Sequence, residues 1–334
     1  MKFLIIRFSS IGDIVLTTPV IRCLKKQVPG IEVHYLTKKS FASVVEANPY
    51  LDKVHLLDHS RELMMYELEN EEYDYIIDLH HNLRTFRIKK KLGIKSFSFN
   101  KLNIQKWIYT NFKWNLLPGV HIVDRYMETV KSFGVKNDGE GLDYFIPEQD
   151  RVSQKDIPAS HHAGYIGIAI GAQHNTKKLP ADKLKKLCSL IDHPIILLGG
   201  KEDAENGKQI SSVDPVKVYN ACGKFKLNES ADLVQKAKLI ISHDTGLMHI
   251  AAAFKKPIIS IWGNTVPEFG MYPYYGKYQI SNLQFQTKGL RCRPCSKIGY
   301  DKCPRGHFKC MNLISEEKIR DAVKQCFQNS HLRA

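Results

Sequence analysis

The sequence lacks the short signatures of several large enzyme classes. No G-x-G-x-x-G follows an apolar run, which counts against the common dinucleotide-binding site. There is no G-x-x-x-x-G-K-[ST], so a P-loop is excluded, and no G-x-S-x-G, the turn that carries the nucleophile of many hydrolases. No two aspartates are spaced as D-x-D, so a carboxylate-held metal for a nucleotide sugar has no obvious position.

Long apolar runs and a secretion signal are also missing. No stretch reaches the roughly 18 apolar residues that a membrane-spanning helix needs. In the opening segment MKFLIIRFSSIGD, Arg7 and Asp13 interrupt the apolar residues, unlike in a signal peptide. We therefore expect a cytoplasmic protein whose membrane contact, if any, is peripheral. Its eight cysteines should then be mostly reduced thiols.

Acidic residues are scarce relative to basic ones. The 334 residues include 34 Asp and Glu against 49 Lys and Arg, a net charge of +15. This excess favours an anionic partner, such as a phosphorylated ligand, a nucleic acid or an anionic membrane face. The hydrophobic fraction of 43% is that of a soluble globular protein, and the length predicts two domains.

Short apolar runs alternate with helical patterns, which predicts an α/β protein with two doubly wound parallel sheets facing a cleft. Expected strands are 2–8, 31–37, 52–58, 73–79, 164–170, 194–200, 238–244 and 256–262, and expected helices are 18–28, 182–191, 228–237, 246–254 and 315–328. Residues 1–150 should form the first domain and residues 161–314 the second, joined by a polar linker at 147–160. Such sheets bind ligands at the carboxyl ends of their strands.

The first candidate site is SSIGDIVLTTP (9–19), where a strand runs into a helix. Asp13 is a favoured residue for capping the helix start. Its position at the carboxyl end of a strand also suits a general base that removes a proton from a hydroxyl. The sequence leaves both readings open.

The second candidate site is KLIISHDTGLMHIAAAFKKPIISIWG (238–263). Asp244, Thr245 and Gly246 form the turn between a strand and a helix, and backbone N–H groups at such a helix start bind phosphate. His249 lies three residues into the helix and, on local grounds, reads as a packed helix residue.

Two further turns follow strands of the second domain. GAQHNTKKLP (171–180) carries Lys177 and Lys178, which either neutralise phosphate in the cleft or form a solvated face. LLGGKED (197–203) carries Glu202 and Asp203, where an acid either hydrogen-bonds a ribose or caps a helix.

A basic segment covers residues 84–113, with nine Lys and Arg, no acid and several aromatic residues. It is either a solvated helical face over core aromatics or a surface for phosphates of a lipid or nucleic acid.

CRPCSKIGYDKCPRGHFKC (292–310) has one C-x₂-C pair and then C-x₃-H-x₂-C. Its possible zinc ligands are Cys292, Cys295, Cys303, His307 and Cys310. Because the second half does not repeat the zinc-ribbon spacing, a buried thiol cluster or loop clamp is the favoured interpretation, with no bound metal.

Several of these motifs, in this order, resemble those of the family 9 glycosyltransferases, the ADP-heptose:lipopolysaccharide heptosyltransferases. The matching stretches are FSSIGDIVLTTPVIRCLKK (8–26), DLHHNLRT (78–85), GAQHNTKKLP (171–180), HDTGLMHIAAA (243–253) and WGNTVPE (262–268). The late cysteine patch is also similar to one in many members. Lys178 and Leu179 stand where the family usually has Arg and Trp, and Asn264 stands where it usually has Pro.

The resemblance implies a GT-B fold of two Rossmann-like domains, with the acceptor in the first and the donor nucleotide in the second. The C-terminal helix, residues 315–334, would pack back on the first domain. The implied reaction is an inverting, metal-independent transfer of heptose from ADP-heptose to the inner core of lipopolysaccharide, without a cofactor. The partners would be the nucleotide sugar, a phosphorylated lipid A-core acceptor and the inner-membrane surface, contacted peripherally, but no nucleic acid.

The resemblance also assigns roles to individual residues. Asp13 would be the base, and Lys177 would contact the donor diphosphate. The other expected donor-site residues are Thr176, Glu202, Asp203, Asp244, Thr245, Gly246 and His249. Those expected on the acceptor side are Ser9, Ser10, Gly12, Asn82 and Arg84.

A glycosyltransferase of the same family that uses another nucleotide sugar remains an alternative, and so do two other classes of protein. A basic nucleic-acid-binding protein could use 84–113 with a zinc knot at 292–310, but the cleft-facing turns would then have no role. An epimerase or dehydrogenase acting on a nucleotide sugar should carry the glycine fingerprint that is missing.

Overall fold

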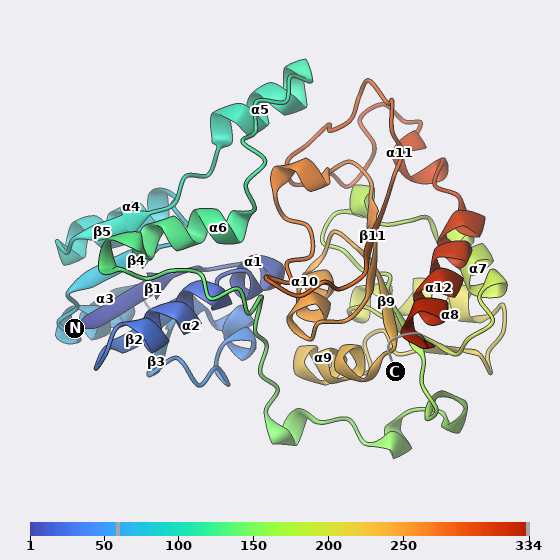
Figure 1. The fold of residues 1–334 in the computed structure, drawn as a ribbon, viewed down its shortest axis with the longest axis horizontal. Coiled ribbons are helices and arrows are strands. Elements are labelled where there is room, and N and C mark those ends of the chain that lie inside the picture. Colours follow the sequence, from blue (N-terminus) through green and yellow to red (C-terminus); the bar gives the residue numbers. More distant parts are fainter. Residues whose placement is uncertain (58–60, 332–334) are drawn as a thin grey trace.

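The computed structural model describes residues 1–57 and 61–331, which form two α/β halves side by side (Figure 1). Each half is built on one sheet in which the paired strands run parallel, with helices on both faces. Apolar clusters fill both faces of the sheets, so the strands are nearly continuous runs of Ile, Leu and Val. Two doubly wound sheets are therefore confirmed.

The first sheet has the strand order β3-β2-β1-β4-β5. Its strands are β1 (Lys2–Ile6), β2 (Glu32–Lys38), β3 (Lys53–Leu57), β4 (Tyr75–Asp78) and β5 (Ser96–Ser98). Its helices are α1 (Ile11–Val15), α2 (Thr18–Gln27), α3 (Arg61–Asn70), α4 (Leu83–Leu92), α5 (Asn103–Phe112) and α6 (Ile122–Met127). The chain reverses its direction of winding between β1 and β4, so the ligand crevice of this half is expected where these two strands end.

The second sheet has the order β11-β10-β9-β6-β7-β8. Its strands are β6 (Ile166–Ala169), β7 (Ile195–Leu198), β8 (Val218–Asn220), β9 (Leu239–His243), β10 (Ile258–Trp262) and β11 (Asn282–Gln286). Its helices are α7 (Ala181–Leu190), α8 (Ala204–Ser211), α9 (Leu227–Lys236), α10 (Gly246–Ala253), α11 (Lys309–Asn312) and α12 (Glu316–His331). Winding reverses between β6 and β9, which places the second crevice at 171–178 and 244–246.

The two halves touch through α1 and α10, which lie against each other in the middle of the molecule (Figure 1). Glycine makes this approach possible. A Cβ atom built on Gly12 would lie 2.5 Å from Cδ2 of His249, and one built on Gly246 would lie 2.8 Å from Cβ of Ile11. The two motifs that the sequence singled out are therefore in direct contact, although more than 200 residues separate them.

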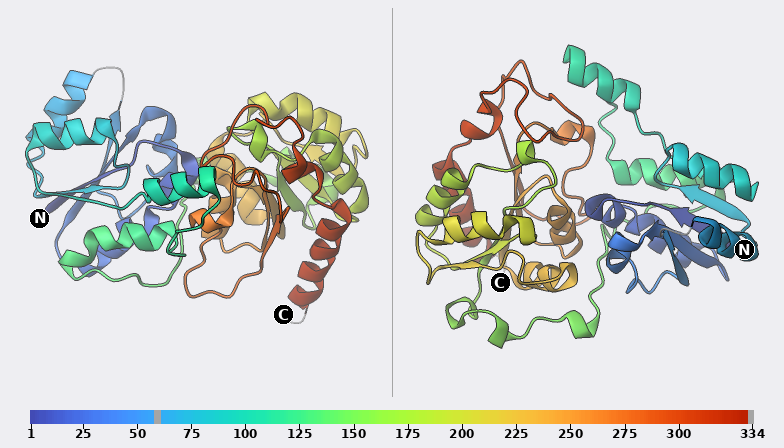
Figure 2. Two further views of the ribbon diagram at one scale, coloured as in Figure 1. Left: turned by 90° about the horizontal axis from the view of Figure 1, so that it is seen from above. Right: turned by 180° about the vertical axis from the view of Figure 1, so that it is seen from behind.

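The final helix does not pack where we expected it. In the described part of α12, Ile319, Ala322 and Val323 join the apolar cluster of the second half, and Glu316 pairs with Lys183 of α7 at 2.9 Å. The prediction that this helix packs back on the first domain is therefore wrong. The apolar face of α12 packs against α7, which lies beside it in the second half (Figures 1 and 2).

Among the described residues, no helix combines the length and apolar character needed to cross a bilayer.

Candidate active site at the contact between the two halves

Asp13 lies in the first turn of α1, directly after β1. Its Oδ2 accepts hydrogen bonds from the backbone N–H of Ser10 at 3.2 Å and from the Ser10 hydroxyl at 2.7 Å. Ser10 is the N-cap residue and Asp13 is the third residue of α1, so the two form a capping box and Asp13 is not itself the N-cap that the sequence suggested. The cap also fixes the direction of the carboxylate, which leaves it available for a second task.

Arg7 is the second neighbour of this carboxylate, with Nη2 2.7 Å from Oδ1 of Asp13. The guanidinium is itself held in place, because it donates to the backbone oxygens of Ser9 at 2.7 Å and Leu79 at 2.6 Å and to the Tyr126 hydroxyl at 3.1 Å. Leu79 directly follows β4, so Arg7 ties the ends of the two central strands together. No local pattern in the sequence marks Arg7 as a residue of this site.

Burial and charge act in opposite directions on the Asp13 carboxyl. Burial alone would raise its pKa, but the Arg7 charge and the hydrogen bonds from Ser10 hold the pKa below its ordinary value. Asp13 is therefore a carboxylate at neutral pH, and its side chain keeps 21% of its surface exposed. It can accept a proton from a group that reaches it.

The start of α10 lies across the contact. Asp244 precedes this helix, and its Oδ2 accepts from Nζ of Lys177 at 2.6 Å and from the Thr265 hydroxyl at 2.9 Å. Lys177 Nζ also lies 3.3 Å from the backbone oxygen of Asp244. The positive end of the helix dipole and the Lys177 ammonium are thus close together, a combination that suits phosphate. Thr265 is a further site residue that the sequence analysis missed.

His249 packs between the two halves, as its local reading suggested. Its side chain is almost fully buried against Gly12, and burial lowers its pKa to about 4. The imidazole is therefore neutral at physiological pH. Its Nδ1 has no hydrogen-bond partner within the described residues.

The remaining donor-side candidates have different surroundings. Asp203 is buried, and its carboxylate accepts from Nζ of Lys178 at 2.8 Å and from the N–H of Gly200 at 3.1 Å. Glu202 beside it is exposed to solvent. Thr176 is also buried, and its hydroxyl exchanges hydrogen bonds with the backbone of Tyr300. Thr176 thus anchors the late cysteine patch.

A groove of about 1230 Å³ opens at the carboxyl edge of the first sheet. Its described lining residues include three predicted acceptor residues, Ser9, Asn82 and Arg84, together with Lys38 and other cations. No carboxylate contributes to that described lining. Ser10 and Gly12 do not line the groove, because Ser10 holds Asp13 and Gly12 packs on α10.

The basic segment is partly neutralised by acids from elsewhere in the chain. Lys89 pairs with Asp78 at 2.8 Å, and Lys91 pairs with Glu69 at 3.0 Å. Arg84 and Arg87 line the groove instead. Only part of the segment therefore faces a possible anionic ligand.

The cysteine patch is held against the loops that follow β10 and β6 in the second half. Arg293 donates to the backbone oxygens of Gly263 at 2.6 Å and Thr265 at 2.8 Å, while Tyr300 holds Thr176. Cys292 Sγ lies 3.7 Å from Nε2 of His307. Across residues 1–57 and 61–331, however, this patch brings no three possible metal-ligand atoms within 4.8 Å of one another. The contacts of Arg293 and Tyr300 favour the loop-clamp interpretation.

Residues 62–300 match the model of glycosyltransferase family 9 (heptosyltransferase). The chain belongs to glycosyltransferase family 9. It is 25% identical to lipopolysaccharide heptosyltransferase 1 of Campylobacter coli, over 98% of this chain and 99% of that one. To lipopolysaccharide heptosyltransferase 1 of Escherichia coli K12 it is 24% identical, over 84% and 92% of the two chains.

Solved structures of similar proteins confirm the fold of this family 9 chain. The family 9 glycosyltransferase of Veillonella parvula has a TM-score of 0.77 at 24% identity, covering 98% of this chain and 97% of that one. The ADP-heptose lps heptosyltransferase II of E. coli has a TM-score of 0.73 at 18% identity, covering 99% and 100%. Family membership leaves the nucleic-acid-binding and dehydrogenase alternatives without support.

Proposed function

We propose that this family 9 chain transfers a heptose from ADP-heptose to the inner core of lipopolysaccharide, with inversion at the anomeric carbon. One observation carries the proposal. The Asp13 carboxylate in the first half and the Lys177–Asp244 pair at the start of α10 lie on the two sides of the contact between α1 and α10. Relatives named as lipopolysaccharide heptosyltransferases match nearly the whole chain, which supports the choice of sugar and acceptor.

In this proposal Asp13 is the general base. The acceptor hydroxyl attacks the anomeric carbon and gives its proton to Asp13, while the bond from that carbon to the diphosphate oxygen breaks. The lowered pKa of Asp13 supports this role, since the carboxylate is deprotonated before the acceptor arrives. Positioned proton acceptors contribute about 10²–10⁴ to rates of this kind.

The departing diphosphate carries away the bonding electron pair and needs positive charge nearby. Lys177 and the N–H groups at the start of α10 offer that charge, and Asp244 orients the Lys177 ammonium. A D-x-D metal site is missing from the sequence, so the proposal assigns leaving-group stabilisation to these protein groups. We assign Asp203 and Glu202 to the nucleotide, on the resemblance alone.

The acceptor side of the proposal rests on the groove at the carboxyl edge of the first sheet. Its cations Lys38, Arg84 and Arg87 suit a phosphorylated acceptor, and the Arg84 guanidinium lies 5.6 Å from the centre of the Phe8 ring. Because such an acceptor is embedded in a bilayer, we also propose that the protein binds the inner membrane peripherally. The exposed helix α5 offers a surface for that contact.

The proposal is tested by following nucleotide release from ADP-, UDP- and GDP-sugars, with a lipid A–Kdo acceptor. We expect turnover with ADP-heptose, and a loss of about 10²–10⁴ in kcat for Asp13→Asn, with little change in the KM for the donor. Asp321→Asn, at an exposed carboxylate of α12, is the matched control and should leave kcat unchanged. Wild-type turnover by Asp13→Asn would refute the base, and release of only UDP or GDP would refute the donor.

A further inference from the structure

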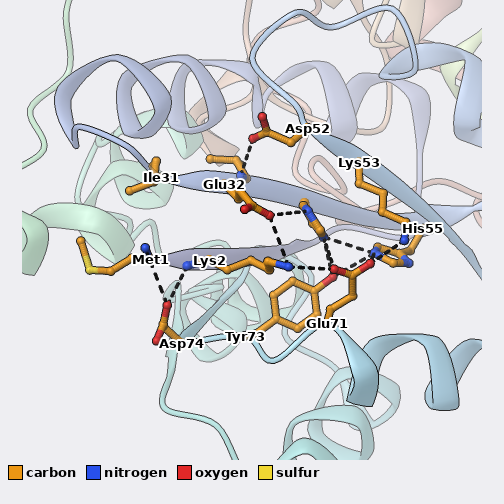
Figure 3. A network of polar contacts seen from close by, with 12 residues as sticks. Met1, Lys2, Ile31, Glu32, Asp52, Lys53, His55, Glu71, Tyr73 and Asp74 are labelled. Carbon is orange, nitrogen blue, oxygen red and sulfur yellow. Dashed lines mark hydrogen bonds and ion pairs between the residues drawn. The ribbon is translucent and has the colours of Figure 1, made fainter.

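A second cluster of ionisable side chains lies away from the proposed active site, toward the amino ends of the first sheet. It consists of His34 on β2, His55 on β3, and Glu71 and Tyr73 just before β4. Three of these, His34, His55 and Glu71, form the one group within residues 1–57 and 61–331 whose possible metal-ligand atoms all lie within 4.8 Å of one another. Figure 3 shows Glu71, Tyr73 and His55 directed toward a common point.

We propose that this cluster is a structural site for a divalent transition metal of the zinc class, with His34, His55 and Glu71 as ligands. Two imidazoles and one carboxylate are a familiar ligand set for zinc, with metal–ligand distances of about 2.0–2.2 Å. Tetrahedral ligands at that distance lie about 3.3–3.4 Å apart. In the cluster Nδ1 of His34 and Nε2 of His55 lie 3.4 Å apart.

The carboxylate is almost as well placed as the imidazoles. Oε2 of Glu71 lies 3.7 Å from Nδ1 of His34, and its Oε1 lies 3.8 Å from Nε2 of His55. A contraction of a few tenths of an ångström would bring these donors to coordination distances. The Tyr73 hydroxyl lies 2.9 Å from both ring nitrogens, where it can serve as a fourth ligand or be replaced by water.

The outer nitrogens of both imidazoles face further carboxylates. Nε2 of His34 lies 3.6 Å from Glu32, and Nδ1 of His55 lies 3.9 Å from Glu67. Histidine ligands usually donate their other N–H to such a group, which fixes the ring and strengthens the ligand.

The positive charges of two nearby lysines disfavour the binding of a cation at this site. Lys2 contacts Glu71 at 2.9 Å, and Lys53 contacts the other oxygen of the same carboxylate (Figure 3). The three acids Glu32, Glu67 and Glu71 outnumber these two cations by one, and Lys53 is half exposed, so its ammonium can turn into solvent when a metal binds. The competing interpretation is a metal-free network, in which the Tyr73 hydroxyl donates to one imidazole and accepts from the other.

The test uses the full-length protein after chelator treatment, titrated with Zn²⁺ and with Co²⁺. We expect about one equivalent to bind with nitrogen and oxygen ligation, seen as visible d–d bands of tetrahedral Co²⁺ without a thiolate charge-transfer band. Zn²⁺ should also raise Tm, because a ligand that binds only the native state stabilises it. No uptake, or uptake with thiolate bands alone, which places the metal at the cysteine patch, would overturn the proposal.

Variants that keep the shape of the side chain can locate the site, because such changes should not prevent folding. Glu71→Gln keeps the shape of the side chain and should weaken metal affinity at least tenfold, and Glu32→Gln should weaken it about tenfold by loosening His34. Asp74→Asn is the matched control. Asp74 binds the backbone N–H of Lys2 at the same end of the sheet but lies outside the cluster, so its variant should bind the metal like wild type. Unchanged affinity in Glu71→Gln would overturn the proposal.

Discussion

Asp13 takes part in capping α1, and we propose that it is also the general base. Its hydrogen bonds to Ser10 cap α1, and they also leave Oδ1 directed at Arg7. A base with a lowered pKa is intrinsically weaker, but it is fully deprotonated at the working pH. Arg7 therefore sets the protonation state of Asp13 and also its position, because the same guanidinium is fixed to Leu79 and Tyr126.

Replacing Arg7 should shift the pH dependence of the reaction. In Arg7→Met, burial still raises the pKa of Asp13, but the opposing charge is gone, so the acidic limb of the kcat/KM profile should move to higher pH. Arg7→Lys keeps the charge and should shift the limb less. Arg320→Met, at a half-buried arginine of α12 in the second half, controls for loss of charge. An acidic limb at the wild-type position in Arg7→Met would contradict this role.

The free energy of unfolding should also depend on pH through the Arg7–Asp13 pair. Because the folded-state pKa of Asp13 lies below the ordinary carboxyl value, the Arg7–Asp13 pair stabilises the native state above that value. This contribution is lost as the pH falls through the lowered pKa. It should be absent at all pH values in Arg7→Met.

At the level of elements, the contact between α1 and α10 places the two halves of the site. Gly12→Ala tests it, because the new Cβ would lie 2.5 Å from the His249 ring and 3.3 Å from Cα of Gly246. We expect α1 and α10 to move apart and kcat to fall by about 10²-fold, the effect of a displacement of roughly 1 Å. Steady-state kinetics, with circular dichroism to confirm folding, would measure this.

Gly207→Ala is the matched control for the α1–α10 contact. Its new Cβ would lie 2.2 Å from the Asn220 side chain, within the second half and away from α10. It should lower Tm but leave kcat of the folded enzyme unchanged. Equal turnover by Gly12→Ala and wild type would show that the contact is not needed for catalysis.

The sequence predicted well those strands that are marked by a continuous apolar run. All eight predicted strands are present, and seven of them are apolar runs that are mostly buried, whereas the eighth, β3, is a partly exposed edge strand. The three that were missed, β5, β8 and β11, are all edge strands with polar residues such as Ser96, Asn220 and Gln284. An edge strand has one neighbour only and needs no continuous apolar run.

Candidate site residues could be named from the sequence where a motif joined a strand to a helix, as at Asp13 and Asp244. Arg7 could not be found this way, since its partners Leu79 and Tyr126 lie 72 and 119 residues along the chain. The same reason hid the ligand set of His34, His55 and Glu71, which only the strand order brings together. Contacts that depend on the strand order join residues far apart in the chain, so they produce no local pattern in the sequence.

At the scale of the whole molecule, exposed aromatic rings gather on one projecting element that has a lysine near each end. Helix α5 has no buried residue and extends away from the body of the first half (Figures 1 and 2). Ile104, Trp107 and Phe112 on this helix and Trp114 just after it are at least half exposed. Lysines flank them at positions 101 and 113. Aromatic rings with adjacent cations are typical of segments that lie in the headgroup region of an anionic bilayer.

We therefore predict that α5 anchors the enzyme to membranes. Co-sedimentation with vesicles that contain anionic lipid should show binding, and Trp107→Ser/Trp114→Ser should weaken it at least about tenfold because less apolar surface enters the bilayer. Raising the salt concentration should weaken the wild type as well, since its lysines act through screened charges. Val216→Ser/Leu313→Ser, at equally exposed apolar residues of the second half, should bind like wild type. Turnover of a soluble acceptor fragment should be unaffected in both double variants, and equal vesicle binding by the tryptophan variant would rule out α5 as the anchor.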